Sequence, residues 1–276
     1  MIFYFITPKN WRNVVLLLFS LVFYAYGAPD FILLLVSSCI ANFYLVKLMH
    51  NAKNQLSKKL YCAAAIVISL GLLIYYKYAN FFVENINLLL EAFGAHTITF
   101  AKVLLPIGIS FFTFQSITYV IDTYRGNNQP MDRLHDYVLY IMMFPQLIAG
   151  PIVRYCDIEQ EIRHRNYDWN EALHGFYRFI IGLSKKVLIS DVIGIQVDKM
   201  LAGDIALMDS GTAWITIIGY TMQLYFDFSG YSDMAIGLGK IMGFHFPENF
   251  DNPYNSTSIT EFWRRWHMTL RSEEHT

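Results

Sequence analysis

Charged residues and cysteines are both scarce in this sequence. Asp, Glu, Lys and Arg make up 16% of its 276 residues, whereas they make up roughly a quarter of a typical soluble protein. The formal net charge of -1 offers no basic surface to phosphate backbones, which argues against nucleic acid as a partner. None of the three cysteines belongs to a CxxC pair, so we expect neither a disulfide framework nor a metal site. Polar low-complexity tracts and heptad repeats are also missing, which excludes the disordered and coiled-coil classes.

Hydrophobic residues make up 55% of the chain and gather into long runs, which predict an all-α, polytopic transmembrane protein. A membrane-spanning helix needs about 20 mostly apolar residues because hydrocarbon offers the backbone no water. Runs that reach or approach this length are 13–26, 31–46, 60–78, 103–121, 174–195, 213–226 and 231–246. Residues 81–93 are expected to form a separate interfacial helix, and Pro106 and Gly108 to kink the fourth run. Prolines and a glycine break segment 137–153, which predicts a re-entrant or surface-lying element shielded by protein.

Polar side chains inside apolar segments should cap helices, line cavities or react, because they are otherwise costly. Ser110, Thr113 and Gln115 interrupt the aromatic segment 106–115 in this way. Two interpretations stay open for them. They form hydrogen bonds between helices, or they line a cavity for an acyl chain or a carrier arm.

Arg154 directly follows the broken segment that contains Pro145, Gly150 and Pro151. The break has a purely structural interpretation, in which nearby polar side chains satisfy the freed carbonyl groups. The functional interpretation is that Arg154 holds an anionic donor, such as the phosphates of coenzyme A, through bidentate hydrogen bonds.

The segment 225–233 places two carboxylates, Asp227 and Asp233, between apolar runs, with Ser229 between them. We expect residues 227–230 to join two helices, and either Asp227 or Ser229 to cap the second of them. In the alternative interpretation, these side chains orient a catalytic imidazole or a polar substrate.

A helix is predicted to begin at Ser258, because Ser258 and Glu261 have the spacing of a capping box. On this helix Trp263, Trp266, His267 and Leu270 would share one side, which puts the imidazole among apolar groups. A buried, neutral histidine with a lowered pKa is suited to take a proton from a hydroxyl group. A purely structural histidine is the competing interpretation.

Three stretches together resemble the membrane-bound O-acyltransferase family. They are the run from Phe226 to Ala235, the segments Pro247-Glu248-Asn249-Phe250 and Pro253-Tyr254, and Phe262-Trp263-Arg264-Arg265-Trp266-His267. The resemblance is greatest to the alginate O-acetylation branch, with the D-alanyl transferases of teichoic acid synthesis as a sister branch. It extends from Pro8 to Leu270, and it implies one membrane domain over residues 1–270 with broken and re-entrant helices.

The resemblance implies an O-acetyltransferase in a bacterial inner membrane. The enzyme takes an acetyl group from a cytosolic thioester, expected to be acetyl-CoA, and needs no bound cofactor. It passes the acetyl group across the lipid bilayer toward an exopolysaccharide or cell-wall polymer, with an extracytoplasmic acetyltransferase as partner. Alternatives are D-alanyl transfer to teichoic acid, a noncatalytic scaffold for a secreted acetyltransferase, and a transporter, although the paired broken helices of a transporter are not evident.

His267 matches one of two prominent family histidines and is therefore the expected catalytic base. The residues expected to support it or to bind the donor are Asp227, Ser229, Asp233, Arg154, Arg264 and Gln115.

Both ends of the sequence depart from the family pattern. Residues 1–6 match only the last turns of an expected first helix, and the second family histidine would lie downstream of the chain. Residues 271–276 read Arg-Ser-Glu-Glu-His-Thr, which is the in-frame translation of a common sequencing adapter. The expectation from the sequence is therefore a fragment with a non-native tail and little activity of its own.

Overall fold

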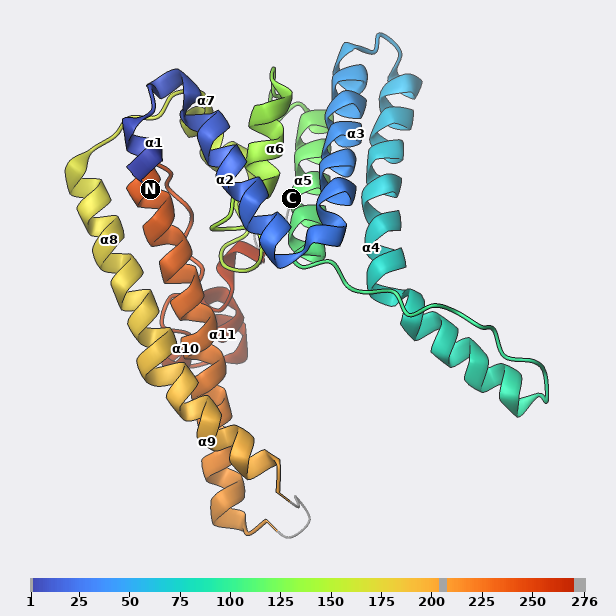
Figure 1. Ribbon diagram of the computed structural model, residues 1–276, viewed down its shortest axis with the longest axis vertical. Helices are drawn as coiled ribbons and strands as arrows, with labels where there is room; N and C mark the ends of the chain where they lie inside the picture. The colour runs from blue at the N-terminus through green and yellow to red at the C-terminus, as the bar shows by residue number, and fades with distance from the viewer. Residues whose placement is uncertain (1, 204–207, 271–276) are drawn as a thin grey trace. The chain divides into compact units, whose positions relative to one another are not determined.

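A computed structural model describes residues 2–203 and 208–270, and Figure 1 shows its course. Over these ranges the chain is helical, and its only extended pairing is an isolated antiparallel bridge between Phe250 and Trp266. The all-α prediction is confirmed. The expected non-native tail lies outside the described residues. The chain divides into two compact units, Met1–Ile148 and Ala149–Thr276, which are described separately.

The first unit contains six α-helices among its described residues. They are α1 (Ile2–Ile6), α2 (Arg12–Gly27), α3 (Ile32–Asn51), α4 (Gln55–Ala92), α5 (Ile109–Arg125) and α6 (Leu134–Met142). Helices α2 and α3 form the hairpin that the runs at 13–26 and 31–46 indicate. Helix α3 packs against α4, α5 and α6, and α2 packs against α6. A short 3-10 turn over Pro29–Phe31 makes the connection of the hairpin.

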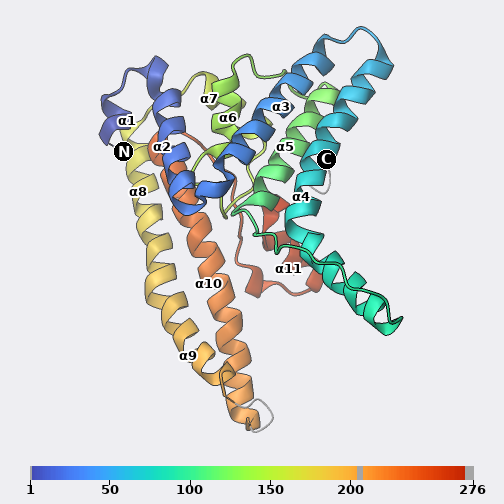
Figure 2. The ribbon, with the colours of Figure 1, turned by 45° about the vertical axis from the view of Figure 1, so that its right-hand side comes forward.

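Helix α4 is one continuous helix of 38 residues, so the prediction of a separate interfacial helix at 81–93 is wrong. Figures 1 and 2 show that it changes direction in its second half. Two asparagines of that half hold the returning chain. The amide of Asn80 donates to the backbone oxygen of Val103 at 2.8 Å and accepts from its N–H at 2.9 Å. Asn87 forms the same pair of bonds with Ile98, at 3.0 and 2.7 Å. These side chains bind the returning backbone in place of water.

Helix α5 begins after Pro106 and Gly108, so these residues end an extended segment and do not kink a helix. Gly108 has the left-handed φ of 75°. A Cβ atom there would lie 2.4 Å from the backbone oxygen of Leu147. The backbone therefore needs glycine at this point, and the expected run at 103–121 becomes a 17-residue helix that begins at Ile109.

The irregular chain after α6 is shielded by protein, as the sequence predicts for the broken segment 137–153. Tyr140 and Leu147 are fully buried, and the side chain of Gln146 donates to the Tyr140 backbone oxygen at 2.6 Å. This bond satisfies a carbonyl group at the end of the helix, which has no N–H of a following helical turn to accept from.

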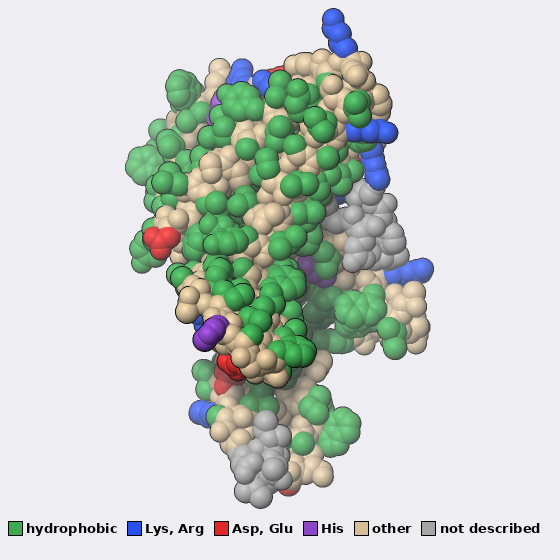
Figure 3. All heavy atoms as spheres, turned by 90° about the vertical axis from the view of Figure 1, so that its right-hand side faces the viewer, with side chains coloured by type: hydrophobic (Ala, Val, Ile, Leu, Met, Phe, Trp, Pro, Cys, Tyr) green, Lys and Arg blue, Asp and Glu red, His purple; other side chains and the backbone are tan. Residues whose placement is uncertain are grey.

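Within residues 2–203 and 208–270, two helical segments are long and apolar enough to cross a membrane, Pro29–Asn51 and Gln55–Ala92. Figure 3 shows the molecule from the side of α4, where hydrophobic side chains cover much of the face and charged side chains are few. Such a face is costly in water and suited to lipid.

The second unit is built on two long antiparallel stretches of helix. The first consists of α8 (Trp169–Ser184), a π-helical segment (Lys185–Ser190) and α9 (Asp191–Leu201), and the second is α10 (Ser210–Met242). Figures 1 and 2 show the two stretches side by side. The other α-helices among the described residues of this unit are α7 (Tyr155–Arg163) and α11 (Ile259–Arg265).

Glycines let α8 and α10 approach closely. A Cβ atom on Gly182 would lie 2.5 Å from the backbone oxygen of Gly230, and one on Gly237 would lie 2.6 Å from that of Gly175. Small residues at such positions are typical of helix pairs in membranes, where dispersion contacts between close backbones provide much of the attraction.

Helix α10 runs without a break through residues 227–230, so the predicted connection between two helices is wrong. The turn-forming residues stay in the helix because partners on the neighbouring stretch satisfy them. Asp227 pairs with Lys186 at 2.5 Å, and Gly230 faces α8 directly. The expectation that Asp227 or Ser229 caps a helix therefore also fails.

Candidate functional site

His267 lies just beyond α11 and not on it. The N-cap prediction is confirmed, since the Ser258 hydroxyl accepts from the Glu261 N–H at 3.1 Å. The helix nevertheless ends at Arg265, and Trp266 is extended (φ −99°, ψ 127°). The prediction that Trp263, Trp266, His267 and Leu270 share one side of a helix is therefore wrong.

Pairing with residues 249–251 causes this early end. The Arg265 backbone oxygen accepts from the N–H of Asp251 at 2.9 Å, and the Met268 N–H donates to the backbone oxygen of Asn249 at 3.0 Å. Between these two bonds, His267 has the left-handed φ of 46°. Such a conformation costs roughly 1–3 kcal/mol in a residue other than glycine and persists only where the surroundings impose it.

The imidazole of His267 is half-buried against an aromatic ring. Phe228 of α10 meets it edge-on, with ring centroids 4.8 Å apart and an interplanar angle of 77°. Trp263 is 57% exposed and so gives little shielding. Burial lowers the pKa of His267 to about 4, so the ring is neutral at physiological pH, as the sequence predicts. Its Nε2 atom is buried and has no hydrogen-bond partner among the described residues.

Asp233 of α10, the helix that also carries Phe228, is the centre of an ion-pair cluster. Its Oδ1 accepts from Arg178 Nε at 3.1 Å and Nη2 at 2.9 Å, and its Oδ2 accepts from Lys185 Nζ at 2.6 Å. Arg178 also binds Glu248 with both terminal nitrogens. The sequence pointed to Asp233 but not to its two cationic partners, which lie about 50 residues away along the chain.

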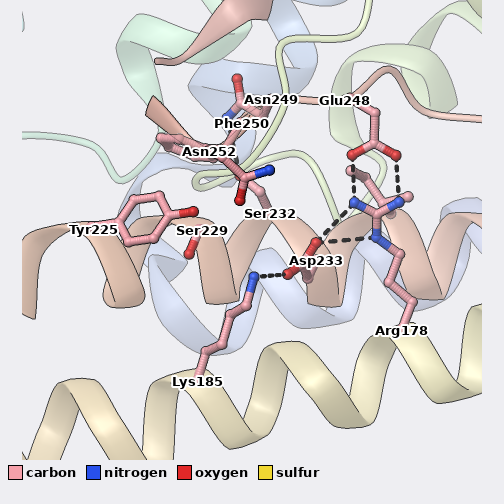
Figure 4. A pocket seen from close by; sticks show the side chains of 11 residues that line it. Arg178, Lys185, Tyr225, Ser229, Ser232, Asp233, Glu248, Asn249, Phe250 and Asn252 are labelled. Carbon is pink, nitrogen blue, oxygen red and sulfur yellow. Dashed lines mark hydrogen bonds and ion pairs between the residues drawn. The ribbon is translucent and has the colours of Figure 1, made fainter. Parts of the chain in front are cut away.

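The cluster lines a pocket of about 150 Å³ within the second unit (Figure 4). Tyr225 and Phe250 form an aromatic part of the lining, and the hydroxyl of Ser229 is buried there without a partner among the described residues. Phe250 contacts Phe228, at a ring distance of 5.0 Å, and Phe228 in turn contacts His267. The imidazole is not part of the pocket lining but lies behind this aromatic layer.

None of the other predicted site residues is among those that line the pocket. Asp227 is about half exposed and binds Lys186. Arg154 precedes α7 and pairs with Asp157 at 3.5 Å, and Arg264 is exposed on α11. Gln115 is buried in α5 of the first unit, and neither polar atom of its side chain has a partner among the described residues. Their roles in donor binding stay predictions.

Asn249 and Thr269 were not singled out from the sequence, although both are almost fully buried beside His267. Asn249 lies in a motif that carried the family resemblance, which was the only available signal. Across the two described ranges, no three His, Cys, Asp or Glu side chains group as metal ligands would.

Removing the carboxylate of Asp233 should destabilise the second unit. Asp233→Ala leaves Arg178 and Lys185 without their shared acceptor, and we expect the free energy of unfolding to fall by about 2 kcal/mol. Asp227→Ala is the matched control. Its carboxylate is 49% exposed, and its loss should cost less than about 1 kcal/mol. Thermal unfolding in detergent measures both, and equal melting temperatures for the two variants would contradict the assignment.

Comparison with known proteins gives the ancestry of this site. Residues 130–272 match the membrane-bound O-acyltransferase family. The probable alginate O-acetylase of Pseudomonas aeruginosa is 42% identical over 97% of this chain and 51% of its own length. The peptidoglycan O-acetyltransferase of Helicobacter pylori is 37% identical over 95% of this chain and 53% of its own length. The teichoic acid D-alanyltransferase of Bacillus subtilis is 33% identical over 59% of this chain and 42% of its own length.

The chain thus spans about half the length of the curated relatives it matches. The family match includes α10, α11 and His267, and the similarity to the alginate relatives extends over both units. This chain belongs to the membrane-bound O-acyltransferase family.

Proposed function

We propose that this chain is part of a multi-pass O-acetyltransferase of the bacterial inner membrane. It takes an acetyl group from acetyl-CoA on the cytosolic side and passes it on for O-acetylation of an exopolysaccharide or cell-wall polymer. The observation that carries the proposal is the half-buried, neutral imidazole of His267, whose Nε2 has no partner among the described residues. The names of the alginate and peptidoglycan relatives support acetyl as the transferred group.

The proposed step is general-base catalysis by His267. Nε2 takes the proton of the acceptor hydroxyl as the hydroxyl oxygen attacks the thioester carbonyl. The C–O bond forms, the C–S bond breaks, and the imidazolium returns the proton to the departing thiolate. The products are an ester and a free thiol, and no redox change occurs. Burial keeps the ring unprotonated throughout the physiological range, because its pKa is lowered to about 4, so Nε2 is free to accept a proton.

Membrane crossing by more than two helices is also part of the proposal. Besides the two segments that qualify by length and composition, the stretch from α8 to α9 and helix α10 carry many exposed large hydrophobic side chains. Lipid is the environment that accommodates such side chains. An extracytoplasmic acetyltransferase is the proposed partner that completes delivery to the polymer.

D-Alanyl transfer is the second candidate, because a teichoic acid D-alanyltransferase is 33% identical over 59% of the chain. Acetyl transfer is favoured over it because the O-acetylating relatives match more of the chain at higher identity.

The test offers each donor, together with a polysaccharide that carries free hydroxyl groups as acceptor, to the full-length protein that carries this sequence, purified into proteoliposomes. Consumption of [¹⁴C]acetyl-CoA, followed as free coenzyme A thiol and labelled ester, is the expected result. A D-alanyl carrier-protein thioester should be spared. Consumption of the D-alanyl donor alone would transfer the assignment to the second candidate. Consumption of neither donor would favour a scaffold or a transporter, and protein-free liposomes are the control.

A further inference from the structure

We propose that the side chains of Asn249 and Thr269 position the imidazole of His267 for proton transfer. The inference rests on the proposed function, because it assigns a role in that reaction to two residues that do not touch the reacting atoms.

A buried hydrogen-bonded relay links four segments of the second unit. The hydroxyl of Thr269 accepts from the backbone N–H of Ile152 at 2.9 Å and donates to Asn249 Oδ1 at 2.9 Å. The amide of Asn249 then donates from Nδ2 to the Ser232 hydroxyl on α10 at 3.0 Å. Asn249, Thr269 and Ser232 each expose 3% of their surface or less. Water therefore cannot readily replace a lost member of the relay.

The relay fixes both partners of the contact between His267 and Phe228. Thr269 lies two residues after His267, and the Asn249 backbone oxygen also accepts from the N–H of Met268 between them. Ser232 lies one helical turn after Phe228, so the two side chains share one face of α10. Asn249 thus ties the segment that carries the imidazole to the helix that supplies the ring against it.

The backbone of His267 shows why such a restraint is needed. Its φ of 46° is unfavourable for a residue other than glycine, and the backbone would relax if the surroundings allowed it. Backbone bonds hold Arg265 on one side and Met268 on the other. The Thr269 hydroxyl adds the side-chain restraint, which links this segment to α10 through Asn249. Without it, the imidazole should move away from the position in which Nε2 meets the acceptor hydroxyl.

The decisive variant is Thr269→Val, which keeps the shape of threonine and replaces its hydroxyl with a methyl group. We expect kcat for thiol release from acetyl-CoA, measured with the full-length protein in proteoliposomes, to fall about 10- to 100-fold, with KM changed less than about 2-fold. Thr269→Ser restores the hydroxyl and should restore kcat. The matched control is Thr221→Val, because among the residues that the structure describes the hydroxyl of Thr221 binds the Ile217 backbone oxygen of its own helix and no other group.

Ser232→Ala provides a second variant in case Thr269→Val fails to accumulate. It removes the anchor on α10 but keeps the bond between Thr269 and Asn249, so a smaller fall in kcat at unchanged KM is expected. An unchanged kcat in whichever variant folds would overturn the inference. So would a rise in KM that accounts for the whole loss, because that result would place the residues in substrate binding.

The His267→Asn variant separates failure of the inference from failure of the proposed function. If His267→Asn loses turnover and Thr269→Val keeps it, the base assignment stands and the positioning role is rejected. If His267→Asn keeps full turnover, the proposed mechanism itself is rejected.

Discussion

Replacing His267 should lower the rate of acyl transfer by about 10²- to 10⁴-fold, which is the usual contribution of a positioned general base. The choice of substitution matters because His267 has a φ of 46°. Alanine is disfavoured in this conformation, whereas asparagine tolerates it better than most residues. His267→Asn therefore removes the basic nitrogen with the least disturbance of the backbone. The measurement is thiol release from acetyl-CoA by the full-length protein in proteoliposomes.

Two comparisons make this result interpretable. The melting temperature of His267→Asn should stay close to that of the unsubstituted protein, whereas His267→Ala should melt lower because of its backbone. Both variants should lose activity to a similar extent. If activity instead followed the melting temperature, so that His267→Asn remained active, the imidazole would be structural.

The pH dependence of the unsubstituted enzyme provides an independent check on the base. The catalytic form is the neutral ring, so kcat/KM should fall only as the pH drops through the pKa of about 4. An acid limb near pH 6.5, the ordinary value for histidine, would show that the ring is solvated during turnover. The shift also affects folding. Between about pH 6.5 and 4 the unfolded chain binds a proton that the folded chain does not, so stability decreases as the pH falls through this window.

The sequence predicts the helices of this protein better than their ends. Apolar runs locate α2 and α3, because the length of an apolar stretch that can cross a membrane is read from consecutive residues alone. Failures occur where a distant partner changes the outcome. Asp227, Ser229 and Gly230 are of turn-forming types, yet the helix continues, with Lys186 bound to Asp227 and α8 packed on Gly230. Helix α11 ends early because Asn249 and Asp251 bind the backbone that follows.

The candidate site shows the same division. His267 could be found from its motif, but the residues expected to bury its ring do not share a helix side with it, and Phe228 of α10 is the ring that packs against it. Its left-handed backbone could not be predicted, and neither could its relay, since Thr269 binds residues 20 and 117 positions away. No periodicity or capping rule connects such distant positions. Only the folded arrangement brings them together.

The same distinction between local propensity and tertiary contact leads to opposite expectations for glycines. Gly71 lies in α4, and nothing lies within 4 Å of an added Cβ atom. Gly71→Ala should therefore raise the free energy of unfolding by up to about 1 kcal/mol, because alanine favours helix. The same change at Gly182 or Gly237 places a Cβ atom 2.5 or 2.6 Å from the backbone of the opposite helix.

We expect Gly182→Ala and Gly237→Ala each to lower the free energy of unfolding by about 1–3 kcal/mol, the usual cost of overpacking. The double variant should lower the free energy of unfolding by close to the sum of the two single effects. The clashing atoms are backbone oxygens, which cannot rotate away as a side chain can, so α8 and α10 must separate. Separation also lengthens the distance from Asp233 on α10 to Arg178 on α8 and Lys185 beyond it, which couples the glycine contact to the pocket.

Thermal unfolding of the three single variants and the double variant in one detergent tests this account. Gly71→Ala should melt at or above the temperature of the unsubstituted protein, and the variants at the interface of α8 and α10 well below it. A cycle that adds Asp233→Ala tests the coupling, because a weakened ion-pair cluster should make this change less costly after Gly182→Ala. Interface variants that melt as high as Gly71→Ala would mean that the two helices are not in close contact in the membrane.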